Sequence, residues 1–341
     1  MDYAFCVAPM LDWTDRHCRF FHRLLTRRAR LYTEMITTGA LLHGDAQRLL
    51  AKEAALPGAG AVALQLGGSE PTDLAACARL AGPAGYDEVN LNCGCPSERV
   101  QRGAFGACLM AEPGLVADCV AAMRDATPLE VTVKHRIGLG RNEHYGFVRD
   151  FVGRVAQAGC GVFVVHARNA WLEGLSPKEN RDIPPLRYDV VARLASDFPS
   201  LRFVLNGGLQ DHDDALRAGA GLHGVMVGRQ AYRDPWMLSQ VDPLHYGVPA
   251  PVAERGAVVE ALATYAAGEV AAGTPLRAVT RHVLGLLNGL PGARRWRQML
   301  SDASLLRGDD ASLILRAFEA ANGRGALAGK SGDAARLDAT A

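Results

Sequence analysis

DEVNLNCGCP, residues 87–96, is the stretch of this chain that decides the fold. Residues 87–92 read as a buried strand, and the Gly and Pro that follow mark a turn. Cys95 is therefore expected on a loop at the carboxyl end of a strand. A thiol in that position can protonate a carbanion, attack an electrophile or bind a metal, and the surrounding sequence decides among these roles.

Similar short runs rich in Val, Leu, Ile and Phe recur along the chain, and most are followed by a helical stretch. Together with the strand described above, these runs cover residues 5–10, 30–35, 62–67, 88–94, 131–136, 161–167, 203–208 and 224–229. Alternation of strand and helix predicts a parallel sheet whose two faces are both covered. Eight such units within roughly 230 residues predict an α/β fold of the (β/α)8 TIM-barrel type. A doubly wound sheet stays open as an alternative, although no GxGxxG follows the first strand.

The composition is typical of a globular protein, with 49% hydrophobic and 21% charged residues. Because 37 basic side chains balance 36 acidic ones, any binding of a polyanion must come from a local basic patch. The eight cysteines form neither a CxxC pair nor a zinc-finger spacing, so we expect reduced thiols and no metal site. No signal peptide or membrane-spanning run is evident, and a cytoplasmic protein is expected.

The pattern changes after residues 235–236. Asp242-Pro243 and Pro249-Ala250-Pro251 read as a linker. Residues 253–272, 276–290 and 292–306 show helical apolar spacing, and residues 312–322 add a further helix. We therefore expect a catalytic barrel over residues 1–241, a small all-helical domain over 250–322, and a disordered tail over 323–341 that is rich in Gly, Ala and charge.

Polar residues gather at the carboxyl ends of the predicted strands, where barrel active sites lie. Asn206-Gly207-Gly208 and Gly228-Arg229 end the last two strands, the usual phosphate grip of such a barrel, although two ordinary tight turns are the alternative. Lys134 ends the fifth strand, and a cation there stabilises the N1–C2=O edge of a reduced flavin. Gln65 is suited to the polar ring edge. His166 is suited to the ring or the phosphate, or is a core histidine. Together they predict FMN rather than a dinucleotide.

Beside a flavin, Cys95 is predicted to act as a general acid. Hydride delivered to one carbon of an activated C=C bond leaves a carbanion at the next carbon, which needs a proton. A thiol suits this role because its reference pKa of about 8.5 keeps it mostly protonated near neutrality. Cys93 is two residues away, at the end of the predicted strand, and is the less suited donor.

Two basic clusters lie outside the predicted strands. The long loop EGLSPKENRDIPPLR, residues 173–187, carries Lys178 and Arg181. The second cluster, RRWR at 294–297, follows Arg277, Arg281 and His282, and helical spacing places Arg294 and Arg297 on one face. Basic side chains with little acid nearby suit contact with a phosphate backbone. A solvated helix face is the alternative for either cluster taken alone.

These segments resemble the tRNA-dihydrouridine synthases. The resemblance covers about residues 4–310 and is carried by motifs such as VAPMLDWTD, YDEVNLNCGCPSERVQRGAFGACLM, VTVKHRIG, HARNAWLEGLSPKENR and GVMVGRQAYRDPW. The central motifs and the long loop look like the A-type subfamily. The resemblance implies an FMN-dependent barrel with a C-terminal helical domain that reduces a D-loop uridine in tRNA to dihydrouridine. It also implies that NADPH reduces the flavin.

Carried over position by position, the resemblance implies that Cys95 is the catalytic acid. It implies FMN contacts at Pro9, Met10, Gln65, Lys134, His166, Asn206, Gly207, Gly208, Gly228 and Arg229. It implies tRNA contacts at Asn92, Lys178, Arg181, Arg294 and Arg297. Cys93 departs from the family pattern and adds a second thiol near the site. No membrane and no stable protein partner are implied.

Two other functions remain open at this point. One is an FMN barrel reductase of a small molecule such as an enone or a pyrimidine. The basic helical domain argues against it, because a small substrate needs no basic appendage. The other is a tRNA-binding chaperone that has lost its chemistry, and the presence of Cys95, Lys134 and His166 argues against that function.

Overall fold

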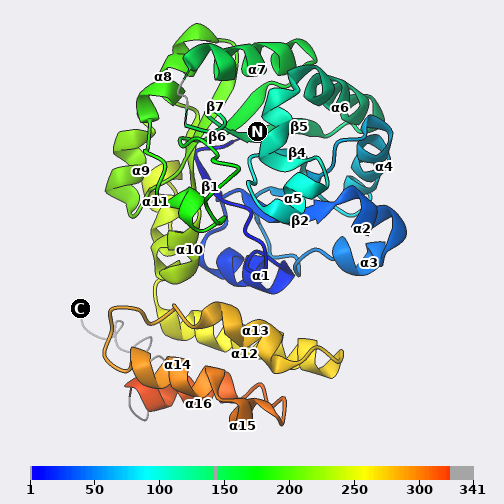
Figure 1. Ribbon diagram of the computed structural model, residues 1–341. Coiled ribbons are helices and arrows are strands. Elements are labelled where there is room, and N and C mark those ends of the chain that lie inside the picture. The colour runs from blue at the N-terminus through cyan, green and yellow to red at the C-terminus, as the bar shows by residue number, and fades with distance from the viewer. Residues whose placement is uncertain (1, 142–143, 323–341) are drawn as a thin grey trace, which may run out of the picture.

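The computed structural model describes residues 2–141 and 144–322, in which parallel strands form a barrel with a group of helices beside it (Figure 1). The strands are β1 (Phe5–Val7), β2 (Leu31–Thr37), β3 (Val62–Gly67), β4 (Glu88–Cys93), β5 (Glu130–Arg136), β6 (Val162–His166), β7 (Arg202–Asn206) and β8 (Gly224–Val227). They pair in the order β1-β8-β7-β6-β5-β4-β3-β2. A parallel bridge between Cys6 and Arg30 joins the two ends of this sheet. The predicted (β/α)8 barrel is therefore confirmed, and a doubly wound sheet is excluded.

Helices follow the strands and cover the outside of the barrel (Figure 1). They are α1 (Arg16–Leu25), α2 (Thr38–His43), α3 (Ala46–Leu49), α4 (Pro71–Ala81), α5 (Glu98–Arg102), α6 (Pro113–Ala126), α7 (Tyr145–Gln157), α8 (Tyr188–Asp197), α9 (His212–Ala218), α10 (Arg229–Arg233) and α11 (Val241–Tyr246), with 3₁₀ helices η1 (Gly106–Ala111), η2 (Glu179–Arg181) and η3 (Pro235–Gln240). Several begin where a side-chain oxygen accepts from a free backbone N–H, as Asp15, Ser97 and Asp211 do. These caps end each loop at a defined residue.

The strands bury side chains on both faces, because alternate residues point to opposite sides of a strand. One set packs against the surrounding helices in the main apolar core. The other set fills the barrel interior and comprises Tyr3, Cys6, Ala8, Tyr32, Ala63, Val162, Val164, Val204 and Met226. The amino end of the interior also holds a buried ion pair, in which Arg30 Nη1 lies 2.8 Å from Glu88 Oε2. The barrel is thus a packed core whose open face for chemistry is at the strands' carboxyl ends.

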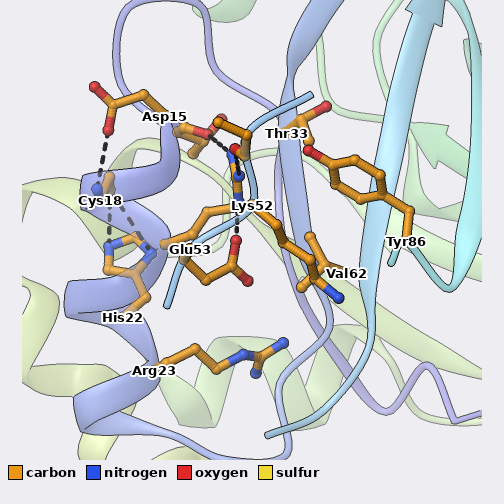
Figure 2. A network of polar contacts seen from close by, with 12 residues as sticks. Asp15, Cys18, His22, Arg23, Thr33, Lys52, Glu53, Val62 and Tyr86 are labelled. Atoms are coloured by element: carbon orange, nitrogen blue, oxygen red, sulfur yellow. Dashed lines mark hydrogen bonds and ion pairs between the residues drawn. The ribbon is translucent and has the colours of Figure 1, made fainter. Parts of the chain in front are cut away.

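Helix α1 is fixed to the barrel by a buried polar network (Figure 2). Arg19 Nε donates to Glu53 Oε2 at 2.7 Å, and both side chains are buried. Asp15 accepts from the backbone N–H of Cys18, whose thiol lies 3.5 Å from His22 Nε2 one turn further along. Removing one partner of a buried ion pair strongly destabilises the fold, because the other charge is left buried without compensation. The segment that carries Glu53 is therefore held firmly against α1.

A second group of helices packs beside α1 (Figure 1). It comprises α12 (Arg255–Ala271), α13 (Leu276–Val283), α14 (Ala293–Ser301), α15 (Ala303–Leu306) and α16 (Leu313–Asn322). Trp296 is buried at its centre and donates from Nε1 to Val283 O at 3.0 Å. The predicted helix over 292–306 is divided, because the Asp302 carboxylate caps a new helix by accepting from Ser304 N.

The prediction that Asp242-Pro243 belongs to a linker is wrong, because both residues lie in α11. Asp242 is buried, and its carboxylate accepts from Arg27 N at 2.9 Å and Arg28 N at 3.1 Å. Proline is tolerated in the first turn of a helix, where its missing N–H has no helical partner. Pro249-Ala250-Pro251 does lie outside the helices.

Within the described ranges, no helix is long and apolar enough to cross a membrane. The tail predicted over 323–341 lies outside the described residues.

Candidate active site

Cys95 lies on the loop that follows β4, and Asn92 shapes that loop. The Asn92 side-chain oxygen accepts from Gly94 N at 3.1 Å and from Cys95 N at 3.0 Å, which forms a tight turn at the strand end. The carbonyl of Cys95 accepts from Ala107 N at 2.9 Å and ties the loop to η1. The Cys95 thiol is half-buried, whereas Cys93 is 0% exposed. Of these two thiols, only Cys95 is open to a ligand.

The strand register places five polar residues next to one another at the carboxyl ends of β4 to β7. Asn92 pairs with Lys134, Arg136 with His166, and His166 with Asn206. Lys134 and Arg136 are two residues apart on β5 and therefore share a face. The result is an arc of polar side chains across four neighbouring strands.

Lys134 is a partly buried cation in the middle of this arc. Removal from water, with the positive charge of Arg136 as a further cause, lowers its pKa to about 7. A negative charge on the Cys95 thiol would raise the pKa of Lys134, so the two groups lie close enough to interact. Among the described residues, the Lys134 ammonium has no hydrogen-bond acceptor and no carboxylate partner. Such a cation suits an anionic or electron-rich ligand.

Arg136 is a site residue to which the sequence analysis gave no role. It is 2% exposed and donates to Gly94 O at 3.1 Å, Asn169 O at 3.1 Å and Asn180 O at 2.8 Å. Burial lowers its pKa to about 9. Arg136 thereby joins the Cys95 loop to the long loop after β6. The sequence signal that could have identified Arg136 is its spacing of two residues from Lys134 on the same strand.

His166 packs against the glycines that end β7. Burial, followed by the charges of Arg136 and Lys134, holds the pKa of His166 well below its ordinary range, so the imidazole is neutral at pH 7. Gly207 has a φ of +118°, and a Cβ there would lie 2.8 Å from His166 Cδ2. Gly208 has a φ of +74°. Both positions therefore require glycine, because the space that a Cβ would take is filled by His166 at Gly207 and by Leu186 at Gly208.

Arg229 begins α10 and turns toward the loop after β6. Its guanidinium donates to the two Asp182 carboxylate oxygens at 2.7 Å and 3.1 Å. It also lies 3.4 Å from Arg181 O. The ion pair is partly exposed. Any phosphate bound by Arg229 would therefore share its guanidinium with Asp182.

The remaining predicted cofactor residues surround the same end of the barrel. Gln65 is 1% exposed; its Oε1 accepts from Asn92 at 2.9 Å and its Nε2 donates to Asn90 at 2.7 Å. Pro9 and Met10 follow β1, and Met10 N donates to Thr14 Oγ1 at 2.9 Å. Gly228 directly follows β8. Asn206 donates from Nδ2 to Met226 O at 2.7 Å.

Positive charge dominates this end of the barrel. The charges of Arg136, Lys134, Arg168 and Arg181 all act on His166. The buried Nε of Arg168 has no hydrogen-bond partner among the described residues. An orphaned buried donor and an unpaired ammonium fit a ligand that carries a phosphate ester and a ring edge able to take up negative charge. The residues present therefore fit FMN.

The predicted tRNA-contacting residues fall into three places. Asn92 is 8% exposed, and its amide is already engaged by Gln65 and the Cys95 loop. Lys178 and Arg181 are exposed on the long loop after β6. Arg294 and Arg297 are exposed on α14, where Arg297 Nη1 donates to Asn288 Oδ1 at 2.9 Å. The structure thus brings Asn92 to the cofactor residues and places the α14 pair on the second group of helices.

Two basic residues of the upstream cluster have another role. Arg281 Nη2 lies 2.6 Å from Asp15 Oδ2, and His282 Nε2 lies 2.9 Å from the same oxygen. They join α13 to the start of α1. The interpretation of this pair as part of a free basic surface is therefore wrong.

Comparison with known proteins gives consistent matches along the chain. A family model described as dihydrouridine synthase (Dus) matches residues 6–322. A Pseudomonas putida protein named tRNA-dihydrouridine(20/20a) synthase is 59% identical over 297 residues, which are 87% of this chain and 88% of that protein. A protein of the same name from Pseudomonas syringae pv. tomato is 60% identical over 298 residues, 87% of this chain and 88% of that protein. One from Shewanella oneidensis is 51% identical over 319 residues, 94% of each chain.

Proposed function

Since the chain belongs to the dihydrouridine synthase family, we propose that it reduces the C5=C6 bond of D-loop uridine in tRNA to 5,6-dihydrouridine. The proposal takes FMN as bound cofactor and NADPH as the reductant. The relatives' name, tRNA-dihydrouridine(20/20a) synthase, supports D-loop positions 20 and 20a as targets. The observation that carries the proposal is an accessible thiol, Cys95, beside an unpaired cation, Lys134, at the open end of the barrel.

Cys95 is the proposed proton donor. When bound, FMN supplies the hydride that one alkene carbon of uracil receives, after reduction by NADPH. Cys95 then transfers the proton from Sγ to the neighbouring carbon, where negative charge develops once hydride has added. Asn92 holds the loop amides of Gly94 and Cys95, so the thiol keeps one position during the transfer.

The polar arc is the proposed flavin site. Lys134 would stabilise negative charge on the polar edge of the flavin ring, and the neutral His166 would add a hydrogen bond without adding charge. The surrounding guanidinium groups suit the phosphate. We assign the ring to Pro9, Met10, Gln65, Lys134 and His166, and the phosphate to Asn206, Gly207, Gly208, Gly228 and Arg229.

The tRNA is held by basic side chains on both parts of the molecule. The target base must leave its stack to reach the pocket, and phosphate contacts elsewhere offset that cost. We assign these contacts to Lys178 and Arg181 beside the barrel opening and to Arg294 and Arg297 on α14, with Asn92 near the target nucleotide. In this proposal residues 1–241 form the catalytic domain and residues 250–322 an RNA-holding domain.

The test uses tRNA from a strain that lacks the gene for this protein. Incubation with the purified protein, FMN and NADPH should produce dihydrouridine in the D-loop, measured by mass spectrometry of nuclease digests. NADPH oxidation with a free enone or pyrimidine, with tRNA left unmodified, would instead establish a small-molecule reductase. Binding of tRNA by a protein that purifies without flavin and takes up none would instead establish a binding protein.

A further inference from the structure

A chain of buried polar side chains runs through the barrel interior toward the loop of the reactive thiol. Glu88, Asn90 and Asn92 alternate along β4 and face the same side. Asn92 Nδ2 donates to Gln65 Oε1 at 2.9 Å, and Gln65 Nε2 donates to Asn90 Oδ1 at 2.7 Å. Asn90 Nδ2 donates to Thr132 Oγ1 at 2.7 Å, and the Thr132 hydroxyl donates to Glu88 Oε1 at 2.5 Å. Gln65, Asn90 and Thr132 are lateral neighbours in the strand register.

Every link in this chain points toward Glu88. Its carboxylate also accepts from Arg30 at 2.8 Å and from the Tyr32 hydroxyl at 3.1 Å. Burial raises the pKa of Glu88, and the Arg30 ion pair together with hydrogen bonds from Thr132, Tyr3 and Tyr32 opposes that shift. Paired with the Arg30 guanidinium, the carboxylate accepts from these hydroxyls and has no proton to give. The single hydroxyl proton of Thr132 therefore goes to Glu88. The Thr132 oxygen is left to accept from Asn90.

Because the Thr132 oxygen can only accept from Asn90, the orientation of each following amide is fixed in turn, as far as the loop after β4. Asn90 Oδ1 accepts from Gln65, and Gln65 Oε1 accepts from Asn92. The Asn92 oxygen is then free to face the loop, where it accepts from Gly94 N and Cys95 N. With the opposite orientation, the Asn92 amide would present N–H groups to two backbone donors. A buried donor left unsatisfied destabilises the orientation that leaves it so.

We propose that Glu88 is a positioning residue that acts through Thr132, Asn90 and Gln65 to fix the orientation of the Asn92 amide and, with it, the loop that carries Cys95. The inference rests on the proposed role of Cys95 as proton donor. Glu88 lies at the amino end of β4, at the far end of the hydrogen-bond chain from the loop, and acts on the loop only through that chain. Buried polar groups contribute little net stability relative to apolar packing, which favours a positioning role.

The test interrupts the chain at Thr132, because Glu88→Gln would leave Arg30 without its carboxylate inside the core. Thr132→Val keeps the side-chain shape, keeps the Glu88–Arg30 pair and removes the hydroxyl. We expect single-turnover uridine reduction to fall about tenfold, equivalent to about 1.4 kcal/mol. We also expect iodoacetamide to alkylate Cys95 several-fold faster, because the loop loses its fixed position. Reduction of the flavin by NADPH should stay at the wild-type rate.

Two matched variants separate positioning from general destabilisation. Thr132→Ser restores the hydroxyl and should recover both readouts. Tyr32→Phe removes a different donor from Glu88 and leaves the chain intact, so it should behave as the wild type even if its melting temperature falls. The proposal is overturned if Thr132→Val keeps wild-type turnover and alkylation, or if Tyr32→Phe loses as much as Thr132→Val. If the wild type itself forms no dihydrouridine, the proposed function fails, while the alkylation rates still test the positioning chain.

Discussion

Cys93 and Cys95 are two residues apart, yet they have different surroundings. Cys93 ends β4 on the side of the main apolar core, where burial raises its pKa well above the ordinary range. Cys95 follows on the turn and is half-buried at the open end of the barrel. Proton transfer requires contact with the substrate carbon, so the position of the thiol decides its role.

Cys95→Ala should bind tRNA and FMN and lose turnover by roughly 10²–10⁴-fold, the usual contribution of a general acid. NADPH should still bleach its flavin, because that half-reaction needs no proton donor to uridine. Stopped-flow absorbance and dihydrouridine analysis measure the two steps separately. Cys93→Ala is the control and should keep turnover while losing about 1 kcal/mol of stability. The reverse result would assign the acid to Cys93.

Lys134 should make the stability of the flavin-free protein depend on pH. Its pKa in the folded protein is about 7, against an ordinary value of 10.5, so the unfolded chain binds more protons between these two values. The free energy of unfolding therefore rises with pH across that window. Below the window it is lowered by a constant amount, because Lys134 is protonated in both states. Lys134→Met should remove the penalty, raise the melting temperature near pH 7 by a few degrees and weaken FMN binding. Melting curves from pH 6 to 10 test this, and an unchanged pH slope in the variant would contradict it.

The loop after β6 is held by arginines on β5, on α10 and within the loop itself. Arg136 on β5 donates to two of its carbonyls, Arg168 donates to Asp182 O at 3.2 Å, and Arg229 on α10 pairs with the Asp182 carboxylate. The loop also carries the exposed Lys178. Arg229, which we propose as a phosphate ligand, therefore also fixes the loop.

A pair of variants separates these two roles of Arg229. If Arg229 binds phosphate, Arg229→Ala should weaken FMN binding about tenfold or more, because charge-assisted hydrogen bonds are lost. Asp182→Ala should leave FMN affinity unchanged or higher, because it removes the carboxylate that competes for the guanidinium. Titration of flavin fluorescence gives both dissociation constants. Equal losses in the two variants would show that Arg229 only anchors the loop.

At the scale of the molecule, the barrel was predictable because eight short runs rich in Val, Leu, Ile and Phe recur, most of them followed by a helical stretch. The run at 62–67, for example, coincides with β3. The gathering of Lys134, His166 and Asn206 also followed, since parallel strands bring their carboxyl ends to one side. Contacts between distant parts of the chain were not predictable. Nothing near Arg281 indicates that it pairs with Asp15, and Asp242-Pro243 has the same local pattern in a turn as in the first turn of a helix.

The two parts of the molecule meet where α1 and α10 of the barrel contact α12 and α13 of the second group of helices. Asp15 binds Arg281 and His282, Arg16 binds Glu269 at 2.6 Å, and the Tyr232 hydroxyl lies 3.1 Å from His282 Nδ1. Substitutions at Arg281 would therefore disturb the junction as well as any RNA contact. On α14, Arg297 donates to Asn288 Oδ1, and Asn288 Nδ2 donates to Arg233 O on α10. Arg294→Ala therefore tests RNA binding with less disturbance of the junction than Arg297→Ala.

Arg294→Ala with Arg297→Ala should raise the apparent KM for tRNA and flatten the salt dependence of tRNA binding. Each phosphate contact contributes about 0.7–0.9 to the slope of log K against log salt, so loss of both contacts should reduce the slope by about one to two. NADPH oxidation by the flavin should stay normal, because the barrel is unchanged. Arg149→Ala with Arg154→Ala on α7 removes the same charge from another exposed helix and is the matched control. An unchanged slope in the α14 variant, or an equal reduction in the α7 variant, would rule out α14 as a specific phosphate-contacting surface.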